Sequence, residues 1–287
     1  MLIGGLGIAT FGLTLPVTRL VVAYSSGTFV GLGRAVFGAL LAVVVLAIVR
    51  PGFPSRPQLL RLAVVAGGVV IGFPVLASIA MGHVPASHGA VVLGVLPLAT
   101  AVVGSLISHE RPSLGFWVCG ALGSLVVVLF ALNEGGGSFG AGDFALVGAI
   151  GAASIGYAVG ARLAIEMGGW QVISWALVLA LPFSIVPMLQ HAPDGWREAP
   201  VSVWLGFAYL CAVSQYFGFF LWYKSLALGG IARVSQVQLL QPFVTFAVAA
   251  AFFGESLTPG ALLALLGVSV AVALGRRMPI RSRAQNG

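Results

Sequence analysis

Apolar stretches long enough to cross a lipid bilayer follow one another along nearly all of this 287-residue chain. A spanning helix needs about 20 mostly apolar residues to cross the hydrocarbon core. Hydrophobic residues make up 59% of the chain and charged residues only 7%, whereas soluble proteins carry about 25% charged residues. We therefore predict an all-α polytopic membrane protein with ten transmembrane helices, at roughly 2–22, 29–49, 60–81, 86–108, 114–132, 144–163, 171–190, 201–223, 232–253 and 259–275.

One segment of the chain occurs twice. Residues 80–115 align without a gap with residues 225–260, at an offset of 145 residues. Each half of the chain holds five predicted helices, and because this number is odd the two copies enter the membrane from opposite sides. We therefore predict two inverted five-helix repeats, residues 1–143 and 144–287. The aligned pairs include Pro97 with Pro242, Thr100 with Thr245, Glu110 with Glu255 and Gly115 with Gly260.

Basic residues are distributed unequally between the predicted links. Cytoplasmic links of membrane proteins are enriched in Lys and Arg, so we expect both termini in the cytoplasm. We expect the protein itself in a bacterial-type inner membrane. The outer links then hold Arg197 alone, and the basic residues are too scattered to form a nucleic-acid site. The inner links and tail hold Arg50, Arg56, Arg61, Arg111, Arg162, Lys224, Arg233, Arg276, Arg277, Arg281 and Arg283.

The fourth helix of each half carries a central proline and ends in an acidic residue before a short link, in ISHERPS and FFGESLTP. Two copies of this pattern in ten apolar helices resemble the drug/metabolite transporter superfamily, specifically its ten-helix EamA-type members. The resemblance covers nearly the whole chain, although His109 stands in the first copy where the second has Gly254. It implies export of small metabolites, often amino acids, through a central cavity, with the aromatic amino-acid exporters as a candidate branch.

The helix at 232–253 concentrates polar side chains on one face. Its polar residues fall within an arc of about 120°, at about 100° per residue. Two glutamines on that face are costly against lipid, so they face either a wet cavity or another helix, and we favour the cavity. The predicted substrate-binding residues are Gln238, Gln241, Ser235 and Thr245 here, with Gln215 and Tyr216 on 201–223, Tyr157 on 144–163 and Thr14 on 2–22.

Prolines, small residues and two arginines indicate candidate hinges, helix contacts and gate residues. A proline inside a helix removes one backbone hydrogen bond, so we predict kinks or hinges at Pro97, Pro242 and Pro74. Small residues spaced by four, such as Gly68 and Gly72, predict close helix packing. Two arginines near outer helix ends either snorkel to the interface or bind a substrate carboxylate there. The predicted gate or mouth residues are Arg19, Arg34 and His83.

The motifs of enzymes are absent from the sequence: it has no HExxH, GxSxG, phosphate loop or metal-spaced Cys/His cluster. We therefore expect no enzyme, no cofactor and no metal. All acidic residues lie at helix ends or in links, so we also expect no carboxylate deep in the membrane for proton or sodium coupling. Coupling would then use His or Glu at the rims, or be absent.

Taken with the resemblance, these features predict a secondary transporter in the lipid bilayer that exports small metabolites by alternating access. Aromatic or hydrophobic amino acids are the first choice of substrate. Efflux of cationic drugs is an alternative, which requires an acidic group in the cavity. A membrane scaffold without transport is another, and it predicts that apolar replacements of Gln238 and Gln241 have no effect.

Overall fold

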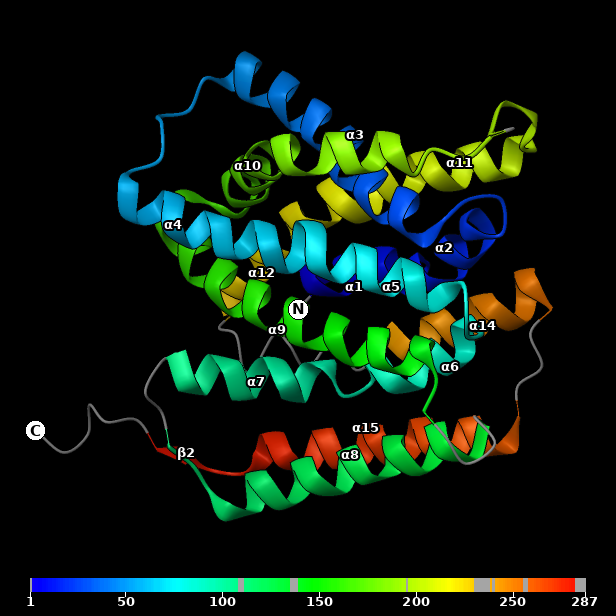
Figure 1. The fold of residues 1–287 in the computed structure, drawn as a ribbon. Helices are drawn as coiled ribbons and strands as arrows, with labels where there is room; N and C mark the ends of the chain where they lie inside the picture. Colours follow the sequence, from blue (N-terminus) through cyan, green and yellow to red (C-terminus); the bar gives the residue numbers. More distant parts are fainter. Residues whose placement is uncertain are drawn as a thin grey trace, which may run out of the picture.

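The computed structural model is a bundle of helices that run roughly parallel to one another (Figure 1). It describes residues 2–107, 111–134, 139–194, 196–229, 238, 241–254 and 258–281. In these residues seven helices are long and apolar enough to span a membrane, which confirms the all-α class: Gly5–Val22, Gly27–Val49, Arg56–Met81, Ala86–Ile107, Ala141–Met167, Gly169–Gln190 and Val201–Leu228. Shorter apolar helices cover Leu114–Phe130, Gln241–Phe252 and Pro259–Gly275, so the number ten stays a prediction.

Several predicted spans consist of two or three helical segments. The first half contains α1 (Leu2–Gly12), α2 (Thr14–Val22), α3 (Gly27–Val49), α4 (Arg56–Val65), the π-helix η1 (Ala66–Gly72), α5 (Phe73–Met81), α6 (Ala86–Leu93), α7 (Leu96–Ile107) and α8 (Leu114–Glu134). The second half contains α9 (Ala141–Met167), α10 (Gly169–Gln190), the short η2 (Trp196–Glu198), α11 (Val201–Tyr209), the π-helix η3 (Leu210–Phe217), α12 (Gly218–Gly229), α14 (Gln241–Phe253) and α15 (Pro259–Arg277).

Side-chain caps fix where some helices begin. Ser26 precedes α3 and its hydroxyl accepts a hydrogen bond from the Phe29 N–H at 3.1 Å. Thr258 does the same for the Ala261 N–H before α15, also at 3.1 Å. Such caps satisfy N–H groups that have no partner within the helix. At the other end of α3, Arg50 has a φ of 50°, a left-handed conformation that ends the helix.

The third predicted span of each half has a π-helical segment in its middle. η1 ends at Gly72 and η3 ends at Phe217, positions separated by the same 145 residues as the sequence repeat. The two segments are joined directly, because Gln215 Nε2 donates a hydrogen bond to the Val69 carbonyl at 3.2 Å. A π-helical turn inside an α-helix frequently marks a functional site. The space between η1 and η3 is therefore a candidate functional site.

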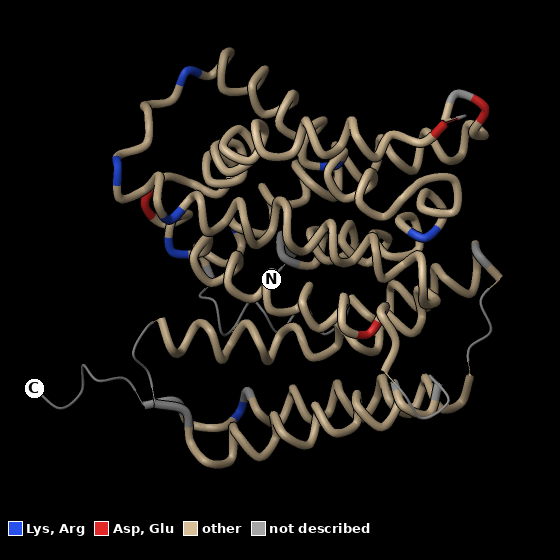
Figure 2. Tube along the Cα trace, viewed as in Figure 1, with Lys and Arg blue, Asp and Glu red and all other residues tan. Residues whose placement is uncertain are grey.

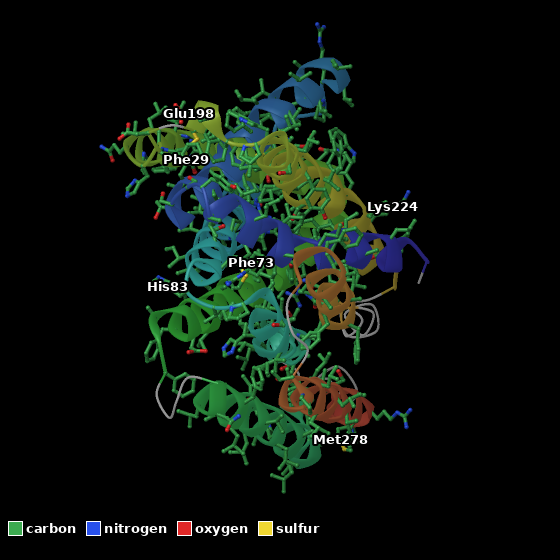
Figure 3. The ribbon with its side chains drawn as sticks, turned by 90° about the vertical axis from the view of Figure 1, so that its right-hand side faces the viewer. Phe29, Phe73, His83, Glu198, Lys224 and Met278 are labelled. Atoms are coloured by element: carbon green, nitrogen blue, oxygen red, sulfur yellow. The ribbon has the colours of Figure 1, made fainter. Side chains whose placement is uncertain are left out.

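Helices at equivalent positions in the two halves pack against each other. α3 packs against α10, α6 against α14 and α8 against α15. The first span of the second half, α9, packs against α4, η1 and α5, and α1 packs in the same way against α12. In both views α8 and α15 form a layer of their own, beside which Met278 lies in Figure 3. The first three of these contacts join elements at corresponding positions of the two predicted halves.

The outer surface and the two ends of the bundle differ in chemistry. Large apolar side chains lie on the outer surface at 71–80% exposure, as a surface in contact with lipid requires: Ile48, Leu114, Ile165, Phe183, Leu228 and Phe252. Lys and Arg gather at the left end of Figure 2. A two-residue strand pair joins β1 (Arg111–Pro112) to β2 (Ile280–Arg281), so the link after α7 and the C-terminal segment lie at one end.

Candidate functional site

Two adjoining buried cavities lie where the two halves meet. The larger has an empty volume of about 340 Å³ and the smaller about 220 Å³. Leu15 and Gln241 line both, so we call the two together the central chamber. Its larger part is walled by the rings of Phe11, Phe73 and Phe219, and Phe73 is labelled near the middle of Figure 3. Its polar lining consists of Thr14, Arg34, Tyr157, Ser214, Gln215 and Gln241.

The chamber is narrow in this conformation. In each part, the centre of a water molecule can move within only about 10 Å³, roughly the room that one water requires. An amino acid therefore cannot enter until the surrounding helices separate. The two larger grooves, of about 860 Å³ and 840 Å³, are almost wholly apolar and involve side chains of the outer surface such as Trp117 and Leu40. They suit lipid chains better than a polar solute.

Arg34 corrects one prediction. We expected it at the outer mouth, but α3 directs it inward and the residue is only 2% exposed. Its Nη2 donates to Ser214 Oγ at 2.9 Å, and Ser214 Oγ in turn bonds Thr14 Oγ1 at 2.8 Å. Within the described part of the chain, its Nε and Nη1 have no hydrogen-bond partner. Arg34 lies about two turns inside α3 and faces η3, so its side chain lines the chamber.

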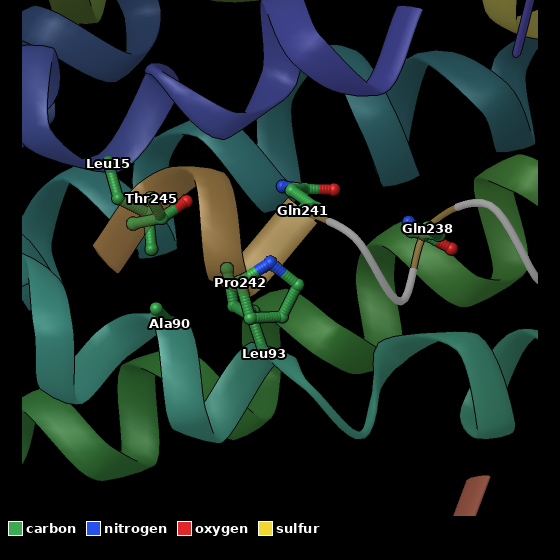
Figure 4. A pocket seen from close by; sticks show the side chains of 7 residues that line it. All are labelled: Leu15, Ala90, Leu93, Gln238, Gln241, Pro242 and Thr245. Atoms are coloured by element: carbon green, nitrogen blue, oxygen red, sulfur yellow. The ribbon is translucent and has the colours of Figure 1, made fainter. Parts of the chain in front are cut away.

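Three glutamines line the chamber, as predicted. Gln215 uses its Nε2 on the Val69 carbonyl, while its Oε1 is buried with no partner among the described residues. Gln238 is 2% exposed, and neither of its amide atoms is bonded within that set. Gln241 is the first residue of α14 and lines both parts of the chamber. Figure 4 shows it at the smaller part. A buried amide without a partner is costly, so Gln215 and Gln238 favour binding of a polar ligand in the chamber.

The helix breaks around the chamber clarify the predicted kinks. Pro74, Pro97 and Pro242 are each the second residue of a helix, namely of α5, α7 and α14. Pro97 follows the turn at Gly94 and Val95, and in the first turn of a helix a proline removes no intrahelical bond. Pro74 instead follows η1 without interruption, inside the helical stretch Arg56–Met81. Pro242 faces Leu93 of α6 across the chamber (Figure 4). Whether the breaks act as hinges stays a prediction.

The smaller part of the chamber also brings together both copies of the sequence repeat. Leu93 and Gln238 are aligned in the repeat, and both line this part. Thr245 lines it too, and its hydroxyl donates to the Gly12 carbonyl at 2.7 Å, next to the break between α1 and α2. Its repeat partner Thr100 instead donates to Leu96 in its own helix, at 2.8 Å. Of these two threonines, Thr245 thus connects its helix to the first span, whereas Thr100 bonds within its own helix.

Two other predicted substrate contacts are not placed in the chamber. Tyr216 is fully buried, but its hydroxyl bonds Ser174 Oγ at 2.8 Å and its ring packs on Phe220, with centroids 4.7 Å apart. It belongs to the helix-packing core because η3 turns it away from Arg34 toward α10. Ser235 falls outside the described residues.

The predicted mouth residues Arg19 and His83 lie beside the link between α5 and α6. Arg19 Nη1 donates to the Val84 carbonyl and, at 3.4 Å, to that of Met81. His83 is exposed within the same link. Both positions agree with a place at one end of the bundle, in contrast to Arg34.

A buried hydrogen bond between a histidine and an aspartate escaped the sequence reasoning. His88 Nε2 lies 2.7 Å from Asp143 Oδ1, and both side chains are 6% exposed. Asp143 Oδ2 also accepts from the Gly140 N–H at 3.0 Å, which caps α9. Asp143 is the third residue of α9, at a helix end as expected of the acidic residues, but its side chain is buried because the start of α9 is covered by α5 and α6. Among the described residues, no three His, Cys, Asp or Glu gather into a metal site.

Comparison with known proteins gives one family. The model of the EamA-like transporter family matches residues 1–132 and 140–275. The "Uncharacterized transporter YdeK" of Bacillus subtilis (strain 168) is 43% identical over 274 residues, which is 96% of this chain and 96% of that protein. A solved crystal structure at 14% identity superposes with a TM-score of 0.68, over 96% of this chain and 95% of its own. That likeness shows the fold alone.

Proposed function

We propose that this chain, which belongs to the EamA-like transporter family, is a secondary transporter that exports small metabolites through the central chamber by alternating access. Membership makes it a multi-pass membrane transporter, with a small-molecule substrate and a lipid bilayer as its surroundings. The substrate, the mechanism and the orientation are our proposals. We assign it to a plasma membrane of the bacterial inner-membrane type.

The observation that carries the proposal is the buried polar chamber between the halves. Gln215, Gln238 and Arg34 all keep polar atoms there without partners among the described residues. Such groups are expensive in a membrane and are commonly retained for a solute pathway. A scaffold would gain stability by replacing them with apolar residues. The cost is offset if these groups bind a transported molecule.

We further propose ten spans in two inverted repeats, residues 1–143 and 144–287, with both termini in the cytoplasm. The matching helix pairs, the 145-residue offset of η1 and η3, and the two stretches of the family match support the repeats. The gathering of Lys and Arg at one end of the bundle supports the orientation (Figure 2). Repeats so related have inward-open and outward-open states of similar energy, which alternating access needs.

Aromatic or other hydrophobic amino acids are the proposed substrates. The rings of Phe11, Phe73 and Phe219 offer apolar contact, and Gln241 and Tyr157 add polar groups. Efflux of cationic drugs ranks lower, because the charged side chain that lines the chamber is the cation of Arg34. Like charges in a poorly hydrated space repel strongly.

Flux measurements test this function. Proteoliposomes loaded with labelled phenylalanine should show saturable efflux with the wild-type protein. Gln241→Leu should reduce that flux about 5- to 150-fold, since one lost polar contact in a desolvated site is worth about 1–3 kcal/mol. Gln190→Leu is the matched control, because Gln190 is exposed at the end of α10 and should keep wild-type flux. Absence of saturable flux for every amino acid would refute the substrate class, and full flux in Gln241→Leu would exclude Gln241 from the substrate path.

A further inference from the structure

Arg34 is a buried cation that lines the central chamber. The residue is 2% exposed, and its Nη2 donates a hydrogen bond to Ser214. Among the described residues its Nε and Nη1 have no partner. A guanidinium cannot lose its proton under ordinary conditions, so burial cannot be relieved by neutralisation. An arginine in this position is costly unless an anion joins it.

The described part of the protein supplies no such anion. Asp143 pairs with His88 at 2.7 Å, and Glu166 pairs with Arg61 at 2.6 Å. Asp194 and Glu198 lie in the link between α10 and α11, outside the bundle. None of these carboxylates is bonded to Arg34. The missing negative charge is therefore expected from a ligand.

The neighbours of Arg34 define what kind of anion fits. Ser214 accepts from Nη2 and shares its other hydrogen bond with Thr14, which closes one side of the guanidinium. The opposite side faces the chamber, where Phe11, Phe73 and Phe219 form apolar walls. A carboxylate matches the planar donor geometry of arginine, and an attached apolar group would contact the rings. An ammonium group finds only neutral oxygens in this part of the lining, from Thr14, Tyr157 and the glutamines.

We propose that Arg34 binds the carboxylate of the transported molecule, so that the ligands are apolar monocarboxylates and the α-amino group is dispensable. The transport part of this statement rests on the proposed function above. The proposal distinguishes the two charged groups of an amino acid. The carboxylate is required for binding and the ammonium group is not. Deaminated analogues of phenylalanine are then expected to bind, and decarboxylated ones are not.

Binding to the purified, detergent-solubilised full chain tests the ligand class. The probes are 3-phenylpropionate, which lacks the amino group, phenethylamine, which lacks the carboxylate, and inorganic phosphate. Isothermal titration should detect 3-phenylpropionate, with an affinity within about tenfold of that for phenylalanine. Phenethylamine and phosphate should bind at least about tenfold more weakly than 3-phenylpropionate. Equal binding of phenethylamine, or of phosphate as a bare anion, would overturn the proposal.

Three substitutions test the role of Arg34 itself. Arg34→Gln should weaken 3-phenylpropionate binding roughly 10- to 100-fold, as expected for losing a charged hydrogen bond. Arg61→Gln is the matched control, because Arg61 pairs with Glu166 on an exposed surface and should bind as the wild type does. Arg34→Met should melt at a higher temperature than the ligand-free wild type, because it removes an unpaired buried charge. Unchanged affinity in Arg34→Gln, or a lower melting temperature in Arg34→Met, would contradict a ligand-binding role.

The outcomes separate this inference from the proposed function. If 3-phenylpropionate binding depends on Arg34 but proteoliposomes carry no amino acid, the anion site stands and the proposed amino-acid transport fails. If phenylalanine flux is saturable but phenethylamine inhibits it as well as 3-phenylpropionate does, the transport stands and the carboxylate assignment fails.

Discussion

Replacing Gly68 with alanine should force η1 away from α9 and destabilise the fold. A Cβ atom built on Gly68 would lie 2.6 Å from the Ala152 carbonyl oxygen and 3.0 Å from the Gly156 nitrogen. Ordinary contacts of a Cβ begin at 3.4 Å, so the nearer pair must separate by about 0.8 Å. Both neighbouring atoms belong to the backbone of α9, and a side-chain rotation therefore cannot relieve the contact.

The expected cost is the overpacking term, about 1–3 kcal/mol of unfolding free energy. Gly67→Ala is the matched control, since its Cβ would meet no atom within 4 Å. Both variants gain the same small backbone benefit of alanine over glycine, up to about 1 kcal/mol, and this term cancels in the comparison. The difference between the two variants thus measures the packing of η1 on α9 alone.

Thermal and denaturant unfolding of the two variants in the same detergent provides the measurement. Gly68→Ala should unfold at a lower temperature than the wild type, and Gly67→Ala at the same or a higher one. Equal stability of the two variants would show that η1 and α9 are not in backbone contact. The close packing inferred from the small-residue spacing would then be wrong, together with the position of Val69 beside Gln215.

Two further predictions concern buried hydrogen bonds. Asp143→Ala leaves His88 buried without its carboxylate and should lower the unfolding free energy by about 1–3 kcal/mol. The double variant with His88→Ala should lose less stability than the sum of the single variants. Additive losses in thermal unfolding would argue against the pair. Tyr216→Phe removes the hydrogen bond to Ser174 and should lower the unfolding free energy by about 0.5–1.5 kcal/mol without changing phenylalanine affinity. A tenfold weaker affinity in isothermal titration would place Tyr216 at the substrate.

The spans and part of the site followed from local signals in the sequence. Runs of about 20 apolar residues predict membrane helices because hydrocarbon leaves the backbone few alternatives. The residues predicted to bind the substrate include Gln215, Gln238, Gln241, Tyr157 and Thr14. All five line the central chamber, and their contact with a substrate stays a prediction. Polar atoms on one helix face in an apolar chain carry this information because lipid excludes them.

The direction of Arg34 depended on tertiary packing that helix position alone does not reveal. Distance from a helix end suggested snorkelling, but the face of α3 that carries Arg34 is the face that packs on η3. One signal was available: Gly38 follows four residues later, and a Cβ on it would lie 3.4 Å from Gln215 Cγ. A small residue one turn away indicates that this face meets another helix.

The pair of His88 and Asp143 was missed for a related reason. The two residues are 55 positions apart and lie on different helices, α6 and α9. Their helices, α6 and α9, both begin on the side of the bundle where α5 ends, which brings the side chains together. Sequence position correctly placed Asp143 near a helix start, but a helix start covered by neighbouring helices is not exposed.

Cysteine accessibility at Gln241 tests the central claim most directly, because this residue joins the two parts of the chamber. Gln241→Cys would be made in a background with Cys119→Ser and Cys211→Ala, and a membrane-impermeant thiol reagent applied to intact cells and to inside-out vesicles. Alternating access predicts modification from both sides, slowed by phenylalanine in each case. Modification from one side only, or from neither, would contradict a chamber that opens in turn to the two faces of the membrane.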